Sequence, residues 1–416
     1  MLKKPELLAP AGDLNKLKTA LAFGADAVYF GLPDFSLRVR INDFNWAKLK
    51  SGVKLAHQAG KKAYVTLNIF AHNYHLPKLV KHLKKLKEIG PDALFVSDPG
   101  VVATIKEIWP EANLSLSTQA NCTNYQSARF WQSQGFKRVI LSRELSMAEI
   151  AEVVKKTPGL EIETFVHGAL CMAYSGRCFL SDLILGRGAN LGDCVQPCRW
   201  EYEIKPLGHE QSFIIGQEEK GSYLMNSKDL CLIKRLPEII ASGVSALKIE
   251  GRAKSAYYIA NVIGAYRRAI DLICAEKLSK KELETELEYL YQELATKLNH
   301  RGLTEGFMFR NEETMQNERN ENYLANWEFS GQIVQVKSHG QGSRVLVQVH
   351  NTLKTSLSIE IIEPGYLVKQ LELANFIDDK TKEIITEAHG GGGGQRVWLE
   401  LDFIPANLSV LRCQTK

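Results

Sequence analysis

The sequence predicts an α/β protein, with a TIM-like (β/α)8 barrel that carries a cysteine-rich insertion and a small C-terminal antiparallel β-barrel. Short apolar runs alternate with helical stretches up to residue 249, as in parallel strands joined by crossover helices. Eight such runs are enough to close a barrel. An open doubly wound sheet is the alternative, but no predicted strand is followed by the glycine-rich phosphate-binding turn of that fold.

The predicted barrel strands each end where polar or glycine residues begin. They cover residues 6–9, 27–30, 63–68, 93–97, 114–117, 138–141, 162–166 and 246–249. Functional residues of such barrels lie in the loops that follow the C-terminal ends of the strands. Polar side chains collect in these loops, namely Arg38, Arg40, Asn68, Gln119, Arg143, His167, Glu250, Arg252 and Lys254. Any one of them is an ordinary strand end, but so many together indicate a site at this rim.

An insertion of about eighty residues, 167–245, separates the seventh and eighth strands, far more than a crossover requires. It holds Cys171, Cys178, Cys194, Cys198 and Cys231. Thiols gathered in this way usually bind a metal, and the chain is too long and too poor in cysteine for a disulfide-stabilised mini-protein. Only the third and fourth thiols come near the spacing of a zinc knuckle, while wide loops suit an iron–sulfur cluster. Zinc, an iron–sulfur cluster and thiols that bind nothing all remain open from the residues alone.

The last part of the chain has a different pattern. After helices expected at 257–275 and from a capping box at Ser279 and Glu282, short alternating runs occur at 330–336, 343–350, 358–362 and 395–401. These runs predict five or six antiparallel strands in a small β-barrel. We therefore divide the chain into a TIM-like barrel at 1–325 and a C-terminal β-barrel at 326–416. The glycines at 390–394 are expected to form a flexible loop without a binding role, because a strand and not a helix follows them.

Composition and motifs exclude several classes of protein. The net charge of +5 permits an RNA partner without demonstrating one, and no apolar run reaches the roughly 18 residues that span a bilayer. The opening MLKKPELLAP has no apolar signal segment, so we expect a cytoplasmic protein with reduced thiols. The zinc-peptidase motif His-Glu-x-x-His, the Gly-x-Ser-x-Gly elbow and the P-loop are all missing from the sequence.

Several blocks of the sequence resemble peptidase family U32, the collagenase-like family. They are Glu163-x-Phe165-x-His167-Gly168-Ala169-x-Cys171, Ser175-Gly176-x-Cys178-x-Leu180-Ser181, Gln196-Pro197-Cys198-Arg199, Lys228-Asp229-Leu230-Cys231 and Lys248-Ile249-Glu250-Gly251-Arg252-x-Lys254-Ser255. The resemblance covers most of the chain. It is strongest to a branch that supports oxygen-independent 5-hydroxylation of wobble uridine in tRNA, with prephenate as hydroxyl donor.

This resemblance implies a 4Fe-4S cluster with Cys171, Cys178, Cys194 and Cys231 as ligands, and with Cys198 as the alternate fourth ligand. It also implies tRNA as partner, and a homologous second protein is a further candidate because one related branch works as a pair of chains. Other branches act on ribosomal RNA cytidine or on a ubiquinone precursor, and these remain alternative substrates. A collagenase-like peptidase is the alternative activity, with Cys171 as nucleophile beside His167.

Roles for the rim residues follow from their chemistry. Glu163, His167, Glu250 and Arg252 are the expected catalytic residues, since carboxylates and imidazole transfer protons, although the two glutamates are equally well explained as ion-pair partners. The carboxylates of prephenate require cationic and amide groups. We expect these groups to come from Arg38, Arg40, Asn68, Gln119, Arg143 and Lys254.

Overall fold

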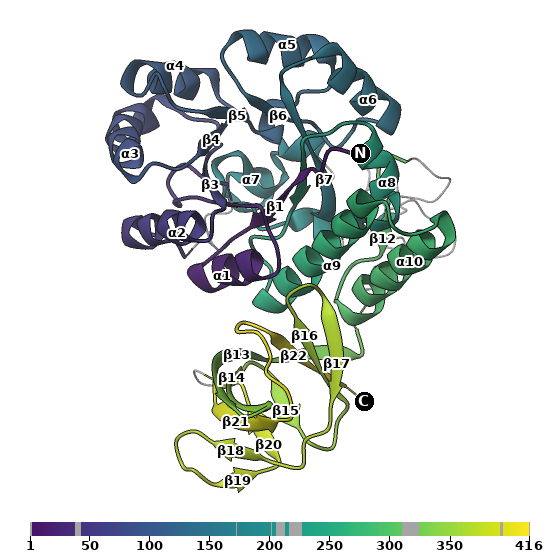
Figure 1. Cartoon of the computed structure of the whole chain (residues 1–416). Coiled ribbons are helices and arrows are strands. Elements are labelled where there is room, and N and C mark those ends of the chain that lie inside the picture. The colour runs from purple at the N-terminus through teal and green to yellow at the C-terminus, as the bar shows by residue number, and fades with distance from the viewer. Residues whose placement is uncertain are drawn as a thin grey trace.

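The computed structural model describes residues 2–37, 43–171, 173–200, 202–204, 213–215, 227–309, 323, 325–391 and 394–415. Its larger part is a closed barrel of eight parallel strands, because β11 pairs with both β1 and β7. The predicted TIM-like barrel is thereby confirmed (Figure 1). The barrel strands are β1 Glu6–Pro10, β2 Ala27–Phe30, β3 Lys62–Leu67, β4 Ala93–Val96, β5 Leu114–Leu116, β6 Arg138–Ile140, β7 Glu161–Ala169 and β11 Ala246–Ile249.

Helices cover the outside of the barrel (Figure 1). They are α1 Leu14–Ala22, α2 Trp46–Gln58, α3 Leu76–Ile89, α4 Pro99–Ile108, α5 Tyr125–Ser133, α6 Met147–Lys156, α8 Leu236–Ala241, α9 Ala256–Ala275 and α10 Lys280–Lys297. Most begin at a side chain that accepts a hydrogen bond from a first-turn amide, which satisfies a backbone donor that the helix itself leaves open. These caps are Asp13, Asn45, Asp98, Asn124, Ser146, Ser255 and Ser279. None of these helices is long and apolar enough to cross a membrane, within the residues described.

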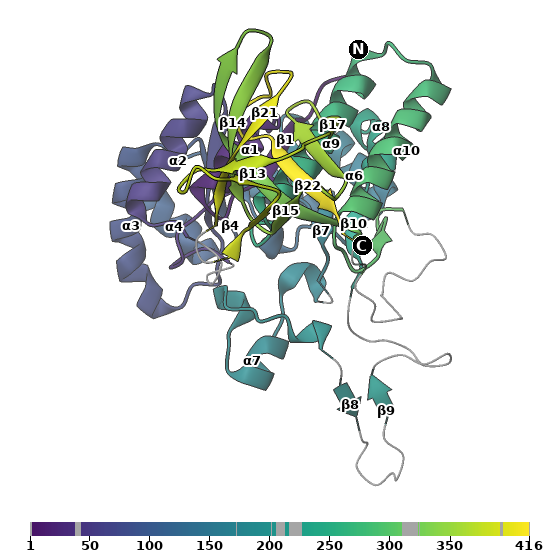
Figure 2. The ribbon, with the colours of Figure 1, turned by 90° about the horizontal axis from the view of Figure 1, so that it is seen from below.

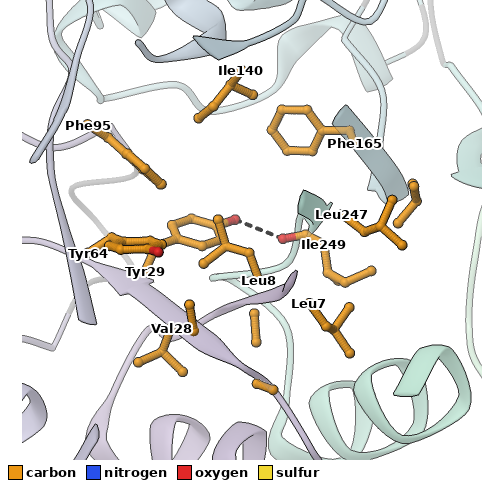
Figure 3. Close-up of a cluster of buried hydrophobic side chains, with 14 of the residues drawn as sticks. Leu7, Leu8, Val28, Tyr29, Tyr64, Phe95, Ile140, Phe165, Leu247 and Ile249 are labelled. Carbon is orange, nitrogen blue, oxygen red and sulfur yellow. Dashed lines mark hydrogen bonds between the residues drawn. The ribbon is translucent and has the colours of Figure 1, made fainter. Parts of the chain in front are cut away.

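Aromatic side chains and a buried ionic cluster fill the barrel. Figure 3 shows Tyr29, Tyr64, Phe95 and Phe165, from four strands, gathered in one group, with the Tyr29 hydroxyl donating to the Ile249 carbonyl oxygen at 3.0 Å. Ion pairs adjoin this group and lie near the start of β6 and β7. There Glu163 is fully buried and accepts from the Arg138 guanidinium at 3.1 Å and from the Lys248 amine at 3.0 Å. These two ion pairs of Glu163 are therefore part of the barrel interior.

Strand β7 contains a bulge that changes the direction of its last side chains. Phe165 pairs with Lys248, but the next pairing with Ile249 is made by His167, so β7 has one extra residue at Val166. A bulge of this kind leaves two residues opposite one and turns the side chains that follow. Beyond the bulge, β7 leaves the barrel and pairs antiparallel with β10 Asp229–Cys231, which in turn pairs with β12 Leu303–Thr304.

The cysteine-rich insertion projects from one end of the barrel (Figure 2). Its described elements are the 3-10 turns Tyr174–Gly176, Ala189–Leu191 and Pro197–Arg199, the short helix α7 Leu180–Leu185, and the antiparallel strands β8 Tyr202–Ile204 and β9 Phe213–Ile215. The chain returns to the barrel at β10 and α8. The insertion thus stands over the ends of the barrel strands.

The C-terminal part is an antiparallel sheet of eight strands, β17-β16-β22-β13-β14-β21-β18-β19, with a separate ribbon of β15 and β20. Their bounds are β13 Trp327–His339, β14 Gly342–Val349, β15 Thr352–Lys354, β16 Ile359–Glu363, β17 Leu367–Leu371, β18 Phe376–Asp378, β19 Ile384–Ile385, β20 Glu387–His389, β21 Arg396–Leu401 and β22 Val410–Gln414. The described edge strands β17 and β19 do not pair with each other, so the hydrogen-bonded ladder of this sheet is not closed; the sheet has an apolar core of its own. The domain division at residue 325 stays a prediction.

Buried polar contacts join the sheet to the barrel. Arg412 is fully buried and forms ion pairs with Glu293 of α10 at 2.7 Å and with Glu360 of β16 at 2.5 Å. Gln332 of β13 donates to the Thr19 hydroxyl of α1 at 2.9 Å. Removing one partner from a buried pair leaves an uncompensated charge, so such contacts hold the two parts in one arrangement.

Candidate functional site

A cavity lies where the C-terminal ends of the barrel strands meet the insertion. It encloses about 980 Å³, including its opening to solvent. Strand-end side chains form one wall and insertion thiols form the other. The lining residues are Tyr29, Leu37, Thr66, Asn68, Phe95, Ser117, Thr118, Gln119, Ile140, Arg143, Phe165, Cys171, Ala173, Gly176, Cys178, Leu180, Ala189, Cys194, Cys198, Lys248, Glu250 and Arg252. The site is thus at the rim of the barrel where enzymes of this fold bind their substrates.

Four thiols face this cavity, those of Cys171, Cys178, Cys194 and Cys198. Two of their sulfurs already accept backbone hydrogen bonds, from the Leu180 amide to Cys178 Sγ and from the Gln196 amide to Cys194 Sγ, both at 3.4 Å. Amide hydrogen bonds to sulfur stabilise thiolate, the form that binds a metal. In the part of the chain described, no three His, Cys, Asp or Glu side chains are yet close enough to hold one metal ion. The donor set and its amide hydrogen bonds nevertheless fit a cluster bound by four thiolates.

The loop between the first two thiols is tied to the barrel rim. Ser175 adopts a left-handed backbone conformation with φ of 44°, and its amide and hydroxyl both donate to the Glu144 carboxylate at 2.6 Å. The Arg177 guanidinium donates to the Gln119 carbonyl oxygen at 3.1 Å, and the Cys178 amide donates to Asn190 Oδ1 at 3.1 Å. These bonds hold the thiols over the strand ends.

Cys231, which we expected to be the fourth ligand, does not line the cavity. It lies on β10 opposite His167 of β7, is 4% exposed, and contacts Tyr266 of α9. Burial raises the pKa of its thiol to about 11, which disfavours thiolate. Cys198, the alternate ligand, lines the cavity with the other three cysteines, and the choice between Cys198 and Cys231 as fourth ligand stays a prediction.

Two of the expected catalytic residues are also placed away from the cavity. His167 is 4% exposed and packs against Tyr258 and Tyr266 of α9, with ring centroids 5.9 and 5.5 Å apart, because the β7 bulge turns it outward. Burial lowers the pKa of His167 to about 3, so the imidazole is neutral at physiological pH. Glu163 does not line the cavity, and its carboxylate forms ion pairs with Arg138 and Lys248, as the ion-pair alternative predicts.

The other two expected catalytic residues do line the cavity. Glu250 Oε2 lies 3.2 Å from the Tyr29 hydroxyl, whose single hydrogen is shared between this carboxylate and the Ile249 carbonyl oxygen. Its backbone is fixed by Gly168, where a Cβ atom would lie 2.3 Å from the Glu250 carbonyl oxygen and where φ is +108°. Arg252 is 5% exposed and donates to the Ser36 hydroxyl at 2.7 Å and to the Leu37 carbonyl oxygen, so it fixes the loop that follows β2.

The expected substrate-binding residues divide into three groups. Asn68, Gln119 and Arg143 line the cavity. Arg38 and Arg40 lie outside the described residues. Lys254 lines a different cavity, between the barrel and the C-terminal sheet, so its expected role at the first site is not supported by its position.

Arg143 and Gln119 have unused hydrogen-bonding capacity at the cavity. The Arg143 guanidinium stacks 3.7 Å from the centre of the Phe165 ring, and no described carboxylate pairs with it. Gln119 is 8% exposed, and its side-chain oxygen has no hydrogen-bond partner among the residues described. Burying a polar group without a partner costs free energy. The two side chains therefore suit a ligand that offers an anion to Arg143 and a hydrogen-bond donor to Gln119.

Lys248 is a site residue that sequence reasoning missed. Its amine lies over the rings of Tyr29 and Phe95 at 4.3 and 4.0 Å and pairs with Glu163. Burial lowers its pKa to about 8, although Glu163 opposes that change. A lysine in the middle of the apolar strand 246–249 was the available signal, since a charged residue is rarely buried without a partner.

Comparison with known proteins shows which family the chain resembles. Residues 12–318 match peptidase family U32. The tRNA hydroxylation protein P of Escherichia coli strain K12 is 41% identical over an alignment that covers 98% of this chain and 95% of the relative. The protein of the same name from Haemophilus influenzae is 43% identical over 74% of both chains. A 23S rRNA 5-hydroxycytidine synthase of Escherichia coli is 35% identical over 73% of this chain and 45% of its own.

A family match along most of the barrel and a relative at 41% identity over almost the whole length lead to one conclusion. This chain belongs to peptidase family U32.

Proposed function

We propose that this protein hydroxylates an RNA base, namely carbon 5 of the wobble uridine of tRNA, without oxygen and with prephenate as hydroxyl donor. The observation that carries the proposal is one cavity lined by four thiols on one wall and by Arg143, Lys248 and Arg252 on the other. Relatives named for tRNA hydroxylation and for 5-hydroxycytidine formation support an RNA base as the substrate class.

The cavity suits a small dianion. Its described lining residues include three basic side chains, those of Arg143, Lys248 and Arg252, and such groups bind carboxylates. Arg143 offers a planar fork of donors and has no carboxylate partner in the described chain. Lys248 adds a charge held in place by Glu163. We therefore assign carboxylate binding to Arg143 first, with Lys248 beneath it.

The thiol wall would hold a 4Fe-4S cluster through Cys171, Cys178, Cys194 and Cys198. When bound, such a group supplies electron transfer, which hydroxylation without oxygen requires and which side chains lack. Glu250 is the one carboxylate among the described lining residues, so we assign it proton transfer at the base. The hydroxyl of Tyr29 orients that carboxylate.

Peptidase activity is the competing hypothesis, and the residues of the site give it little support. The Cys171 nucleophile would need a base, but His167 is buried against α9 and does not line the cavity. Its pKa of about 3 also leaves no imidazolium to activate a thiol. Ribosomal RNA cytidine and a ubiquinone precursor remain alternative substrates, because the same cavity chemistry would serve them.

The test is a deletion strain complemented with wild type, with Cys171→Ala, or with Cys274→Ala as the matched control outside the cavity. Mass spectrometry of nucleosides from tRNA and from 23S rRNA should show 5-hydroxyuridine lost in the deletion and in Cys171→Ala, and restored by wild type and by the control. If only the 5-hydroxycytidine of ribosomal RNA were lost, ribosomal RNA would replace tRNA as the proposed substrate. Unchanged nucleosides in a strain that also lacks every homologue would refute RNA hydroxylation, and gelatin cleavage by an iron-free sample would favour the peptidase. The homologous second protein stays a prediction, which co-purification from the complemented strain would test.

A further inference from the structure

A second cavity lies in a groove between the barrel and the C-terminal sheet. It encloses about 1310 Å³, including open solvent, and is separate from the candidate site. One side is formed by the loop before α9 and by the first turn of that helix, and the other by β13 and by His350 and Asn351, which directly follow β14. Figure 2 shows β13, β14 and β15 lying across α1 and α9 in projection. We call this cavity the interdomain groove.

Three aromatic rings form a stack along this groove. The rings of Tyr257 and Phe329 are 5.5 Å apart with an angle of 10° between their planes, and those of Phe329 and His350 are 4.3 Å apart with an angle of 22°. Tyr257 is buried, Phe329 is half-buried and His350 is exposed. The stack therefore begins in the interior and ends at the surface with a flat ring.

The backbone that carries His350 is held firmly. Its amide donates to the Ser330 carbonyl oxygen at 2.9 Å. A Cβ atom at Gly390 would lie 1.7 Å from the His350 carbonyl oxygen, so only glycine permits this approach. Gly390, the first residue of the glycine run for which the sequence indicated no binding role, thus packs against the backbone at the end of the stack.

Lysines and acidic residues both line the groove. Lys16, Lys254 and Lys297 are balanced in part by Asp13 and Glu328, Lys16 pairs with Asp13 at 3.1 Å, and Lys297 pairs with Glu360 at 3.9 Å. The Lys297 amine lies 3.6 Å from the centre of the Trp327 ring. Basic side chains beside stacked aromatic rings are typical of sites that bind single-stranded nucleic acid.

The interdomain groove adjoins the candidate site through one loop. Glu250 and Arg252 line the site, while Lys254 and Ser255 line the groove. Two residues of backbone span at most about 7 Å, so the backbone of one short loop borders both cavities. A strand whose reacting base enters the site must place its neighbouring nucleotides nearby.

We propose that the interdomain groove binds an unpaired nucleotide of the substrate RNA, with its base stacked on the His350 ring as a fourth member of the stack. This inference rests on RNA as the substrate of the proposed function. The base would contribute its flat face, which every base has, so the groove binds RNA with little sequence preference. The nearby lysines contact the phosphates.

Binding of a short fluorescein-labelled single-stranded oligoribonucleotide to the full chain tests this proposal by fluorescence anisotropy. His350→Ala should weaken binding about tenfold, the effect of losing one stacking partner, whereas His350→Phe should bind like wild type because it keeps the flat ring. His339→Ala is the matched control, an exposed histidine of β13 that pairs with Glu400 and does not line the groove. A duplex RNA of equal length should not distinguish the variants.

Equal affinities of His350→Ala and wild type would overturn the groove proposal. Weak binding by both His350 variants would also overturn it, because that result would indicate hydrogen bonding by His350 instead of stacking. Neither result touches the proposed activity, which is measured separately as 5-hydroxyuridine in tRNA. Conversely, a groove that binds single strands in a protein that leaves tRNA unmodified would sustain this inference and refute the activity.

Discussion

Replacing Lys248 with methionine should change how the stability of the protein depends on pH. The Lys248 side chain is 5% exposed, and its pKa is lowered from 10.5 to about 8, chiefly by burial. This difference corresponds to about 3 kcal/mol. The groups that act on the amine are Glu163 and Glu250, which raise its pKa, and Arg138, which lowers it.

The sign follows from proton binding. Between about pH 8 and pH 10.5 the unfolded chain keeps a proton on Lys248 that the folded chain has lost, so the free energy of unfolding rises with pH in this window. Below pH 8 both states are protonated and the full cost of burying the charge is present. Because Lys248→Met has no such proton, the stability of wild type relative to this variant should increase by about 3 kcal/mol across the window.

Urea unfolding of both proteins at several pH values between 7 and 10.5 measures this difference. Glu163→Gln is the matched variant, because it removes the ion pair at 3.0 Å and should move the lower limit of the window below pH 8. Parallel pH curves for wild type and Lys248→Met would refute the reasoning. Binding of a dicarboxylate by wild type should also weaken as pH rises through about 8, since the charge of Lys248 is then lost.

Three further predictions concern the cavity. Arg143→Ala should weaken dicarboxylate binding about tenfold or more in calorimetry while leaving the melting temperature unchanged. Arg143→Lys should restore only part of the lost affinity. Wild-type affinity in Arg143→Ala would contradict the assignment. Cys198→Ala should lose iron and visible absorbance after anaerobic reconstitution, whereas Cys231→Ala should keep both, and the reverse pattern would restore Cys231 as ligand. Gly168→Ala should cost about 1–3 kcal/mol in urea unfolding and displace Glu250, because φ is +108° and the new Cβ would meet its carbonyl oxygen; a wild-type midpoint would argue against that contact.

The order of the barrel strands was readable from the chain because each strand is a local apolar run between helical stretches. The structure places β2 at Ala27–Phe30 and β11 at Ala246–Ile249, the ranges expected from the sequence. The capping box at Ser279 and Glu282 is likewise local and is present. Patterns of this kind depend on near neighbours, so they survive without knowledge of the tertiary structure.

The gathering of thiols and cations at one rim was also predictable, because parallel strands all end at the same edge of a barrel. Asn68, Gln119 and Arg143 follow three different strands and meet in the cavity. The positions of the two candidates for the fourth ligand were not predictable from the sequence. Cys231 pairs with β7 on strand β10, whereas Cys198 lines the cavity.

Side-chain direction was decided by contacts between distant parts of the chain. One extra residue in β7 turns His167 from the cavity to α9, and no local pattern marks such a bulge. Glu163 and Lys248 are 85 residues apart in the sequence and form a buried ion pair. Glu163, a candidate catalytic residue, therefore has a structural partner. Lys254 lies two residues beyond Arg252, yet it faces the interdomain groove because the C-terminal sheet packs there. A sequence gives residue types and local geometry, whereas the partner of a buried charge is set by the packing of elements that are far apart in the chain.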